Sequence, residues 1–121
     1  MSQSRRYIFP AQNRIKKRRD FVNIRNRGRR FKTPHFYIHV LSENGGLRLG
    51  VTVSKRIGNA PVRNRVKRLL REFFRLNFDK LPAGADVSIV ARRNAGLLSL
   101  AGVTDELNVL FALALDREGH V

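Results

Sequence analysis

Two stretches of the chain alternate between apolar and polar residues, at 35–41 and at 47–54. In the first stretch the alternation separates two sets of side chains, Phe36, Ile38 and Val40 on one side and Tyr37 and His39 on the other. Alternation of this kind predicts β-strands with one buried face. The strong turn signal Asn44-Gly45-Gly46 lies between the two stretches. We therefore expect them to pair as an antiparallel hairpin.

Two other segments carry apolar residues at helical spacing. The first runs from Asn13 or Arg14 to about Asn26, with an apolar stripe formed by Ile15, Phe21, Val22 and Ile24. The second begins at Gly58-Asn59-Ala60-Pro61, with Asn59 or Ala60 as the cap, and continues to about Phe78. Its predicted apolar stripe consists of Val62, Val66, Leu69, Leu70, Phe73 and Leu76. Both segments are therefore predicted to be amphipathic helices.

The remaining elements complete a mixed fold. A strand is predicted over 86–92, with Val87, Ile89 and Ala91 on one side, and a short edge strand over 29–33. Ser99 is placed to cap a last helix that carries Val103, Leu107, Leu110, Phe111 and Ala114. The predicted order is α-β-β-β-α-β-α. We expect one α+β domain over 1–121, a two-layer α/β sandwich, with 1–12 as a flexible lead-in.

The charge distribution indicates what kind of partner the protein binds. The chain of 121 residues has 25 Lys and Arg against 9 Asp and Glu, a net charge of +16. Residues 1–75 hold 21 of the basic residues and 3 acids, whereas 76–121 hold 4 basic residues and 6 acids. Such segregation favours a polyanionic partner, with nucleic acid ahead of an anionic membrane surface. The absence of Cys excludes disulfides, thiolate metal sites and a Cys nucleophile.

The densest group of cations falls on the second predicted helix. Arg63, Lys67 and Arg71 are spaced at i, i+4 and i+8, and Arg75 continues the row. Arg68 follows Asn64 at the same spacing and adds a second row beside the first. Arg binds phosphate oxygens in a bidentate manner, and Asn is able to contact a base edge or a 2′-hydroxyl. A solvated helix face is the less favoured interpretation, because nearly every counter-charge is missing.

These residues also carry a family resemblance. The run Ser-Lys-Arg-Ile-Gly-Asn-Ala over 54–60 is followed by Arg63-Asn64-Arg65, Lys67-Arg68 and Arg71-Glu72. Together they resemble the signature of the bacterial ribonuclease P protein subunit. The resemblance covers most of the chain and includes Asp20-Phe21, the 50–54 strand and Val90-Ala91-Arg92.

The resemblance implies a function and a set of partners. In this family a ribonucleoprotein endonuclease removes the 5′ leader of precursor tRNA, and the RNA subunit with its magnesium hydrolyses the phosphodiester. It implies a cytoplasmic protein that binds one catalytic RNA subunit and precursor tRNA. It implies no membrane, no obligate protein partner, and no cofactor or metal held by the protein alone. It also implies a left-handed βαβ crossover, contrary to the usual right-handed rule.

Two sets of site residues follow from the resemblance. The surface for the RNA subunit is expected to comprise Lys55, Arg56, Arg63, Asn64, Arg65, Lys67, Arg68 and Arg71. The leader cleft, between the N-terminal helix and the sheet, is expected to comprise Phe21, Arg25, Tyr37, His39, Thr52 and Ser54. Arg25 and His39 stand where the family pattern has aromatic residues, a second aromatic one turn after Phe21 and a Tyr on the strand. Arg is able to stack on a base and pair with phosphate, whereas His stacks more weakly.

Several alternatives remain open at this level. Phe21 is a core residue or a stacking platform, and Arg92-Arg93 is a further RNA contact or a solvated strand end. A ribosomal-RNA-binding structural protein and a DNA-compacting or transcription module both fit the charge. Catalysis by the protein itself is disfavoured, because the acids before residue 76 are isolated in sequence. His35 and His39 are separated by about 13 Å along one strand, too far to flank one phosphate.

Overall fold

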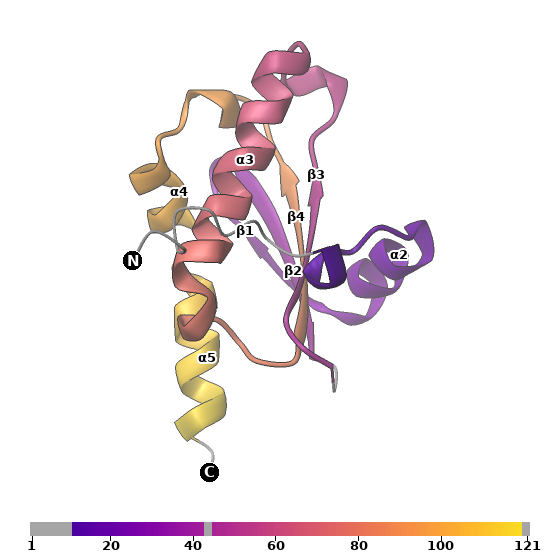
Figure 1. Ribbon diagram of the computed structural model, residues 1–121, viewed down its shortest axis with the longest axis vertical. Coiled ribbons are helices and arrows are strands. Elements are labelled where there is room, and N and C mark those ends of the chain that lie inside the picture. Colours follow the sequence, from indigo (N-terminus) through magenta and orange to yellow (C-terminus); the bar gives the residue numbers. More distant parts are fainter. Residues whose placement is uncertain (1–10, 43–44, 120–121) are drawn as a thin grey trace.

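The computed structural model describes residues 11–42 and 45–119, a four-stranded sheet covered by helices (Figure 1). Its strands are β1 (Arg29–Lys32), β2 (Phe36–Ser42), β3 (Arg48–Thr52) and β4 (Ala85–Ala91). Its α-helices are α2 (Arg18–Arg27), α3 (Ala60–Asn77), α4 (Leu100–Glu106) and α5 (Val109–Gly119). The α+β class is confirmed. Of the expected lead-in, residues 1–10 lie outside the described residues, and residues 11 and 12 belong to a 3₁₀ turn, η1 (Ala11–Asn13).

The predicted hairpin between the two alternating stretches is wrong. The strand order is β1-β2-β4-β3, so β4 lies between the strands that were expected to pair. It runs antiparallel to β2, with Ile38 opposite Ile89, and parallel to β3, with Val51 opposite Ile89. A turn signal predicts a change of direction but does not select which strand becomes the neighbour.

Burial explains why β4 takes the central place. Six of its seven residues are buried, including Asp86 and Ser88 on the side away from the apolar set. A strand that is buried on both faces usually occupies a central position in a sheet, whereas a half-exposed strand can form the edge. In Figure 1, α3 lies in front of the sheet and the chain passes leftward from β3 to β4. With both strands running upward, this makes the crossover left-handed, as the family resemblance implies.

The first helix begins later than predicted, at Arg18 instead of residue 13 or 14. The residues before it are used to cover the free edge of β3. The Ile15 amide donates to the Leu49 carbonyl at 2.8 Å, and Asn13 Nδ2 donates to the Leu47 carbonyl at 2.8 Å. Satisfying edge carbonyls outweighs the helical pattern here, because an unpaired strand edge leaves polar backbone groups without partners.

Two apolar clusters lie on opposite faces of the sheet. The larger is formed by α3, α4 and α5 against the face that bears Phe36, Ile38 and Val40. The smaller joins Ile15, Ile24 and Leu41, with Phe21 packed against it, and seats α2 on the other face. The predicted alternation of β2 is therefore confirmed, and helices cover both faces.

Helix α3 begins as predicted, with Asn59 Oδ1 accepting from the Val62 amide at 3.1 Å. Its buried face follows Val66, Leu70, Phe73 and Phe74, at i, i+4, i+7 and i+8. Leu76 was expected in the stripe, but it lies at the border of this face and is 53% exposed. Phe74, which the predicted stripe omitted, lies on this face and is fully buried.

The C-terminal helix was predicted as one element and is two, α4 and α5, separated at Leu107 and Asn108. Ser99 caps α4 as expected, accepting from the Gly102 amide at 3.2 Å. The break redirects the chain so that Leu107 and Leu110 are both fully buried. Among the helices of the described ranges, none combines the length and apolarity that crossing a lipid bilayer requires.

Candidate nucleic-acid interface

A groove of about 590 Å³ lies between α2 and the sheet, on the face opposite α3. It is lined by Lys16, Arg18, Phe21, Val22, Arg25, His39, Thr52, Ser88 and Val90. Four of the residues predicted for a leader cleft thus lie together, although they come from α2 and two different strands. The groove combines cations, an aromatic ring and hydroxyl groups, which is the composition of a single-strand nucleic-acid site.

Phe21 is positioned by a glycine. A Cβ atom on Gly50 of β3 would lie 2.4 Å from Phe21 Cε1 and 3.2 Å from Ile15 Cβ. Only glycine therefore leaves room for the ring to lie on the sheet. The side chain is half-buried, packs against the smaller apolar cluster and also lines the groove. The two interpretations of Phe21, as core residue and as part of the cleft, describe two sides of one ring.

His39 lies deeper than the sequence suggested. It is 6% exposed, and its Nδ1 has no hydrogen-bond partner among the described residues. Burial lowers the pKa of His39 below its ordinary 6.5, and the charges of Arg30 and Arg25 lower it further. The imidazole is therefore neutral at neutral pH, and the positive charge of the groove comes from its arginines and Lys16.

Two of the predicted cleft residues do not line the groove. Ser54 lies beyond the end of β3, exposed before the 3₁₀ turn η2 (Lys55–Ile57). Tyr37 was expected in the cleft but does not line the groove, and the guanidinium carbons of Arg30 and Arg92 lie 4.6 and 4.8 Å from its ring centroid. Its aromatic surface is therefore already in contact with two cations.

Sequence reasoning missed five of the groove residues, namely Lys16, Arg18, Val22, Ser88 and Val90. The signal for two of them was present. If Val87, Ile89 and Ala91 share one side of a strand, then Ser88 and Val90 share the other. The incorrect hairpin prediction placed β3 beside β2, in the position that β4 occupies. The side of β4 that bears Ser88 and Val90 was therefore not expected to line the groove.

The second basic surface, the α3 ridge, comprises the eight residues predicted to contact the RNA subunit. Lys55 and Arg56 are exposed in η2, and Asn64 and Arg68 are exposed on α3. Lys67 and Arg71 are half-buried along the flank of the same helix. In the described part of the chain, no carboxylate pairs with any of the eight. The nearest acid in sequence, Glu72, is engaged by Arg75 through an Nε–Oε1 bond of 3.0 Å.

Backbone carbonyls hold two ridge arginines in place. Arg63 Nη1 donates to the Gly58 carbonyl at 2.7 Å, and Arg65 Nη1 donates to the Gly96 carbonyl at 2.9 Å. Gly58 has a φ of +156°, a conformation that strongly favours glycine, at the turn into α3. Each arginine uses one nitrogen for this hydrogen bond to a backbone carbonyl, and its other N–H donors are able to bind a ligand. Arg63 and Arg65 therefore flank the exposed Asn64 as fixed cations.

One ridge residue, Arg71, lies near a like charge, Arg14. Burial lowers the pKa of Arg71, and the positive charge of Arg14 lowers it further. The Arg71 side chain nevertheless remains cationic at neutral pH. The Arg14 Nε atom is buried without a hydrogen-bond partner among the described residues. Two partly desolvated guanidinium groups near one another are stabilised by an anion between them.

A cationic helix on one face of a sheet and a basic, aromatic groove on the other define a nucleic-acid-binding α+β protein. Comparison with known proteins identifies the family. The model of the family named Ribonuclease P matches residues 9–114. The chain belongs to this family.

Individual relatives agree. The chain is 42% identical over 114 residues to the ribonuclease P protein component of Desulforapulum autotrophicum, covering 93% of this chain and 97% of the relative. It is 52% identical over 108 residues to that of Syntrophus aciditrophicus, covering 88% and 90%. Of the solved structures, the Staphylococcus aureus protein matches with a TM-score of 0.75 at 30% identity, covering 84% and 94%. The Thermotoga maritima protein matches with a TM-score of 0.74 at 30% identity, covering 82% and 96%.

Family membership decides between the alternatives that charge left open. The chain is an accessory protein of the endoribonuclease that matures the 5′ end of tRNA, and its partner is an RNA subunit. Neither a ribosomal structural role nor a DNA-compacting role is needed to explain the charge. The family predicted from the Arg63-Asn64-Arg65 segment is confirmed.

Proposed function

We propose that the two basic surfaces bind two different RNA molecules, the α3 ridge the RNA subunit and the groove the 5′ leader of precursor tRNA. One observation carries this division. The ridge and the groove lie on opposite faces of one thin sheet, so that a single chain is able to touch two RNA segments at once. A protein with one cationic face would bind either RNA but would not align them.

The ridge suits an RNA backbone held in a defined position. Its arginines present planar donors to phosphate oxygens, and the backbone anchors of Arg63 and Arg65 reduce the entropy lost on binding. The groove suits a single strand. Its cations follow a backbone, Phe21 offers a stacking surface, and the hydroxyls of Thr52 and Ser88 are able to bond to a base or a ribose.

In this proposal the protein positions RNA and the RNA subunit carries out the hydrolysis with its own magnesium. Protein cations near the junction of the two RNAs reduce their mutual repulsion, which magnesium otherwise has to screen. We propose one protein for each RNA subunit, with no obligate protein partner and no membrane. In this proposal the protein acts in the cytoplasm, where bacterial tRNA precursors are made.

Cleavage of precursor tRNA by the RNA subunit, with and without the protein, tests the proposal. We expect the protein to raise turnover most at low magnesium and to lower the magnesium concentration that half-maximal turnover requires. Equal turnover with and without the protein at low magnesium would contradict it. Cleavage by the protein alone, freed of nucleic acid, would overturn the assignment of the chemistry to RNA.

A further inference from the structure

Three residues from neighbouring strands form a compact stack at one end of the groove. Tyr37 lies on β2, Arg30 on β1, and Arg92 directly after β4. The guanidinium carbon of Arg30 is 4.6 Å from the Tyr37 ring centroid, and that of Arg92 is 4.8 Å from it. Because β1 and β4 flank β2 in the sheet, the two cations reach the ring from both neighbouring strands.

The stack is fixed on the side of Arg92. The Arg92 Nη1 atom donates to the carbonyls of Thr33 and Pro34, the latter at 3.2 Å. The segment Thr33-Pro34-His35, between β1 and β2, is itself held by hydrogen bonds. Glu106 Oε1 accepts from Thr33 Oγ1 at 2.6 Å and from the His35 amide at 2.9 Å. Arg92 therefore holds a defined position and retains unused donors on its other nitrogens.

Charge in the stack is not compensated. In the described part of the chain, neither Arg30 nor Arg92 pairs with a carboxylate, and the nearby Glu106 is engaged by Thr33 and His35. Each cation is attracted by the face of the ring, which offsets part of the repulsion between the two arginines. The two guanidinium groups contact one ring without a counter-ion in the described part of the chain, and each presents donors that match the oxygen atoms of a phosphodiester.

The groove leads to this stack. Arg30 pairs with His39 across β1 and β2, and Tyr37 pairs with Val90 across β2 and β4. His39 and Val90 both line the groove. Tyr37 is two residues from His39, about 7 Å along the strand. A single strand of RNA that lies in the groove and leaves along β2 therefore passes over the stack.

We infer that Arg30, Tyr37 and Arg92 form a clamp for a phosphate of the leader, beyond the nucleotides that lie in the groove. The clamp rests on the proposed function of the groove as the leader site. Tyr37 acts in it as a positioning residue, because its ring holds two arginines and is not free to stack on a base. Arg30 and Arg92 make the contact, and the phosphate is bound without regard to base sequence.

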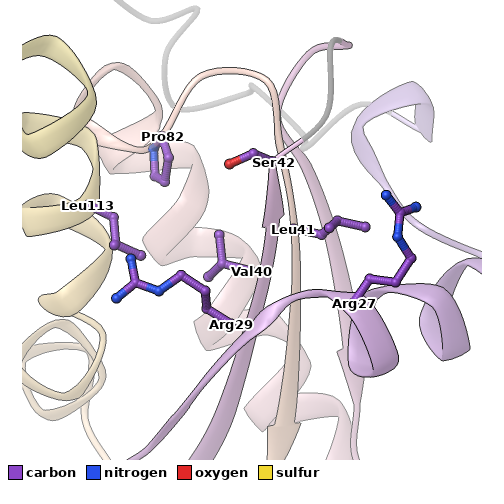
Figure 2. A pocket seen from close by; sticks show the side chains of 7 residues that line it. All are labelled: Arg27, Arg29, Val40, Leu41, Ser42, Pro82 and Leu113. Carbon is purple, nitrogen blue, oxygen red and sulfur yellow. The ribbon is translucent and has the colours of Figure 1, made fainter. Parts of the chain in front are cut away.

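The chain supplies matched controls. Arg29 neighbours Arg30 but projects from the other side of β1; it lies over Phe31, at 5.1 Å from that ring, and Figure 2 shows it directed toward Leu113 of α5. It lines a separate pocket of about 190 Å³ that shares no residue with the groove. Arg93 neighbours Arg92 and is exposed. Substitution of Arg29 or Arg93 lowers the net charge by the same amount as substitution of Arg30 or Arg92, but it leaves the clamp residues unchanged.

The experiment measures binding of precursor tRNAs to the assembled holoenzyme while the leader is lengthened one nucleotide at a time. For the wild type we expect affinity to rise in a final step when the leader becomes long enough to reach the clamp. Arg30→Gln and Arg92→Gln should each remove that step, weakening long-leader binding about tenfold and leaving short-leader binding unchanged. The salt dependence should fall by about 0.7 in log K per tenfold salt for each phosphate that is no longer neutralised. Arg29→Gln and Arg93→Gln should retain the step.

Variants of Tyr37 test whether the ring positions the two arginines, because they leave the charge of the protein unchanged. Tyr37→Phe keeps the ring and should retain the step, whereas Tyr37→Ala should remove it. The effects of Tyr37→Ala and Arg30→Gln should not add, since both disable one clamp. Within the described residues, Arg30 donates to no backbone carbonyl, so Arg30→Gln remains informative if Arg92→Gln lowers the melting temperature.

Two results would overturn the clamp. One is an unchanged length step in Arg30→Gln. The other is an equal loss for short and long leaders, which would assign these arginines to the RNA subunit. A wild-type holoenzyme whose affinity does not depend on the leader at all would instead defeat the proposed function of the groove, so the two failures are distinguishable.

Discussion

The α3 ridge and the groove are both cationic, yet they are built in different ways. On the ridge, charge lies along α3 and the short turn η2 before it, and two of its arginines donate to backbone carbonyls. In the groove, charge is mixed with a half-buried aromatic ring, a neutral buried histidine and two hydroxyl groups, which together come from four separate elements. The ridge is therefore suited to phosphates alone, whereas the groove is suited to phosphates and bases together.

This difference explains which parts of each surface tolerate change. A helix positions its side chains by local geometry, so exposed ridge residues such as Asn64 and Arg68 are placed correctly once α3 forms. The groove depends on long-range packing, since Phe21 on α2 must meet Gly50 on β3. Changes on the ridge should alter binding without altering structure, whereas changes near the groove should alter both.

The largest expected effect comes from the ridge. In Arg65→Ala combined with Arg68→Ala, we expect the affinity for the RNA subunit to fall by about a hundredfold or more at low salt. The slope of log K against log salt should become shallower by about 0.7 to 0.9 for each phosphate that the variant leaves unpaired. Binding titrations across salt concentrations measure both. Arg93→Ala is the control, and a ridge variant with wild-type affinity would remove the distinction between the surfaces.

Gly50→Ala is expected to damage the groove and spare the ridge. Its Cβ would overlap the Phe21 ring, so we expect unfolding free energy to fall by about 1–3 kcal/mol and leader-dependent binding to weaken. Affinity for the RNA subunit should be unchanged in the folded protein. Thermal unfolding and binding to precursors with and without a leader measure these effects. Gly46→Ala, where a Cβ meets nothing within 4 Å, is the matched control.

Arg25→Phe tests how the groove divides its work between charge and stacking. The substitution removes one cation and supplies a ring, and stacking on one base contributes about 1–3 kcal/mol. We expect leader affinity at moderate salt to change by less than about tenfold, while the salt dependence of leader binding falls by about 0.7. Binding isotherms at several salt concentrations decide it. An unchanged salt dependence would show that Arg25 does not meet a phosphate.

The smallest expected effect concerns acid. Because burial and two arginines lower the pKa of His39 in the folded state, the unfolded chain takes up that proton first. Stability should therefore fall as pH drops below about 6.5, with a slope of at most about 1.4 kcal/mol per pH unit for this one proton. His39→Tyr should remove that slope, as measured by denaturant unfolding between pH 7 and 5. An identical slope in the variant would contradict the burial of a neutral His39.

Much of the local structure was predictable because it depends on neighbours in sequence. The Asn59 cap, the length of α3 and the two sides of β2 follow from patterns that span a few residues. The ridge followed for the same reason. Where prediction failed, a distant partner intervened: the edge of β3 drew residues 13–15 out of the predicted helix, and β4 replaced β3 beside β2.

The residue pattern alone is therefore sufficient to predict the class of fold, the helix that carries the ridge and the family to which the chain belongs. The tertiary structure alone decided that Ser88 and Val90 line the groove, that Tyr37 is covered by two arginines, and that His39 is buried. The reason is physical. Periodicity reports which side of an element faces the core, but strand order and side-chain contacts depend on which surfaces can be buried together across the whole chain.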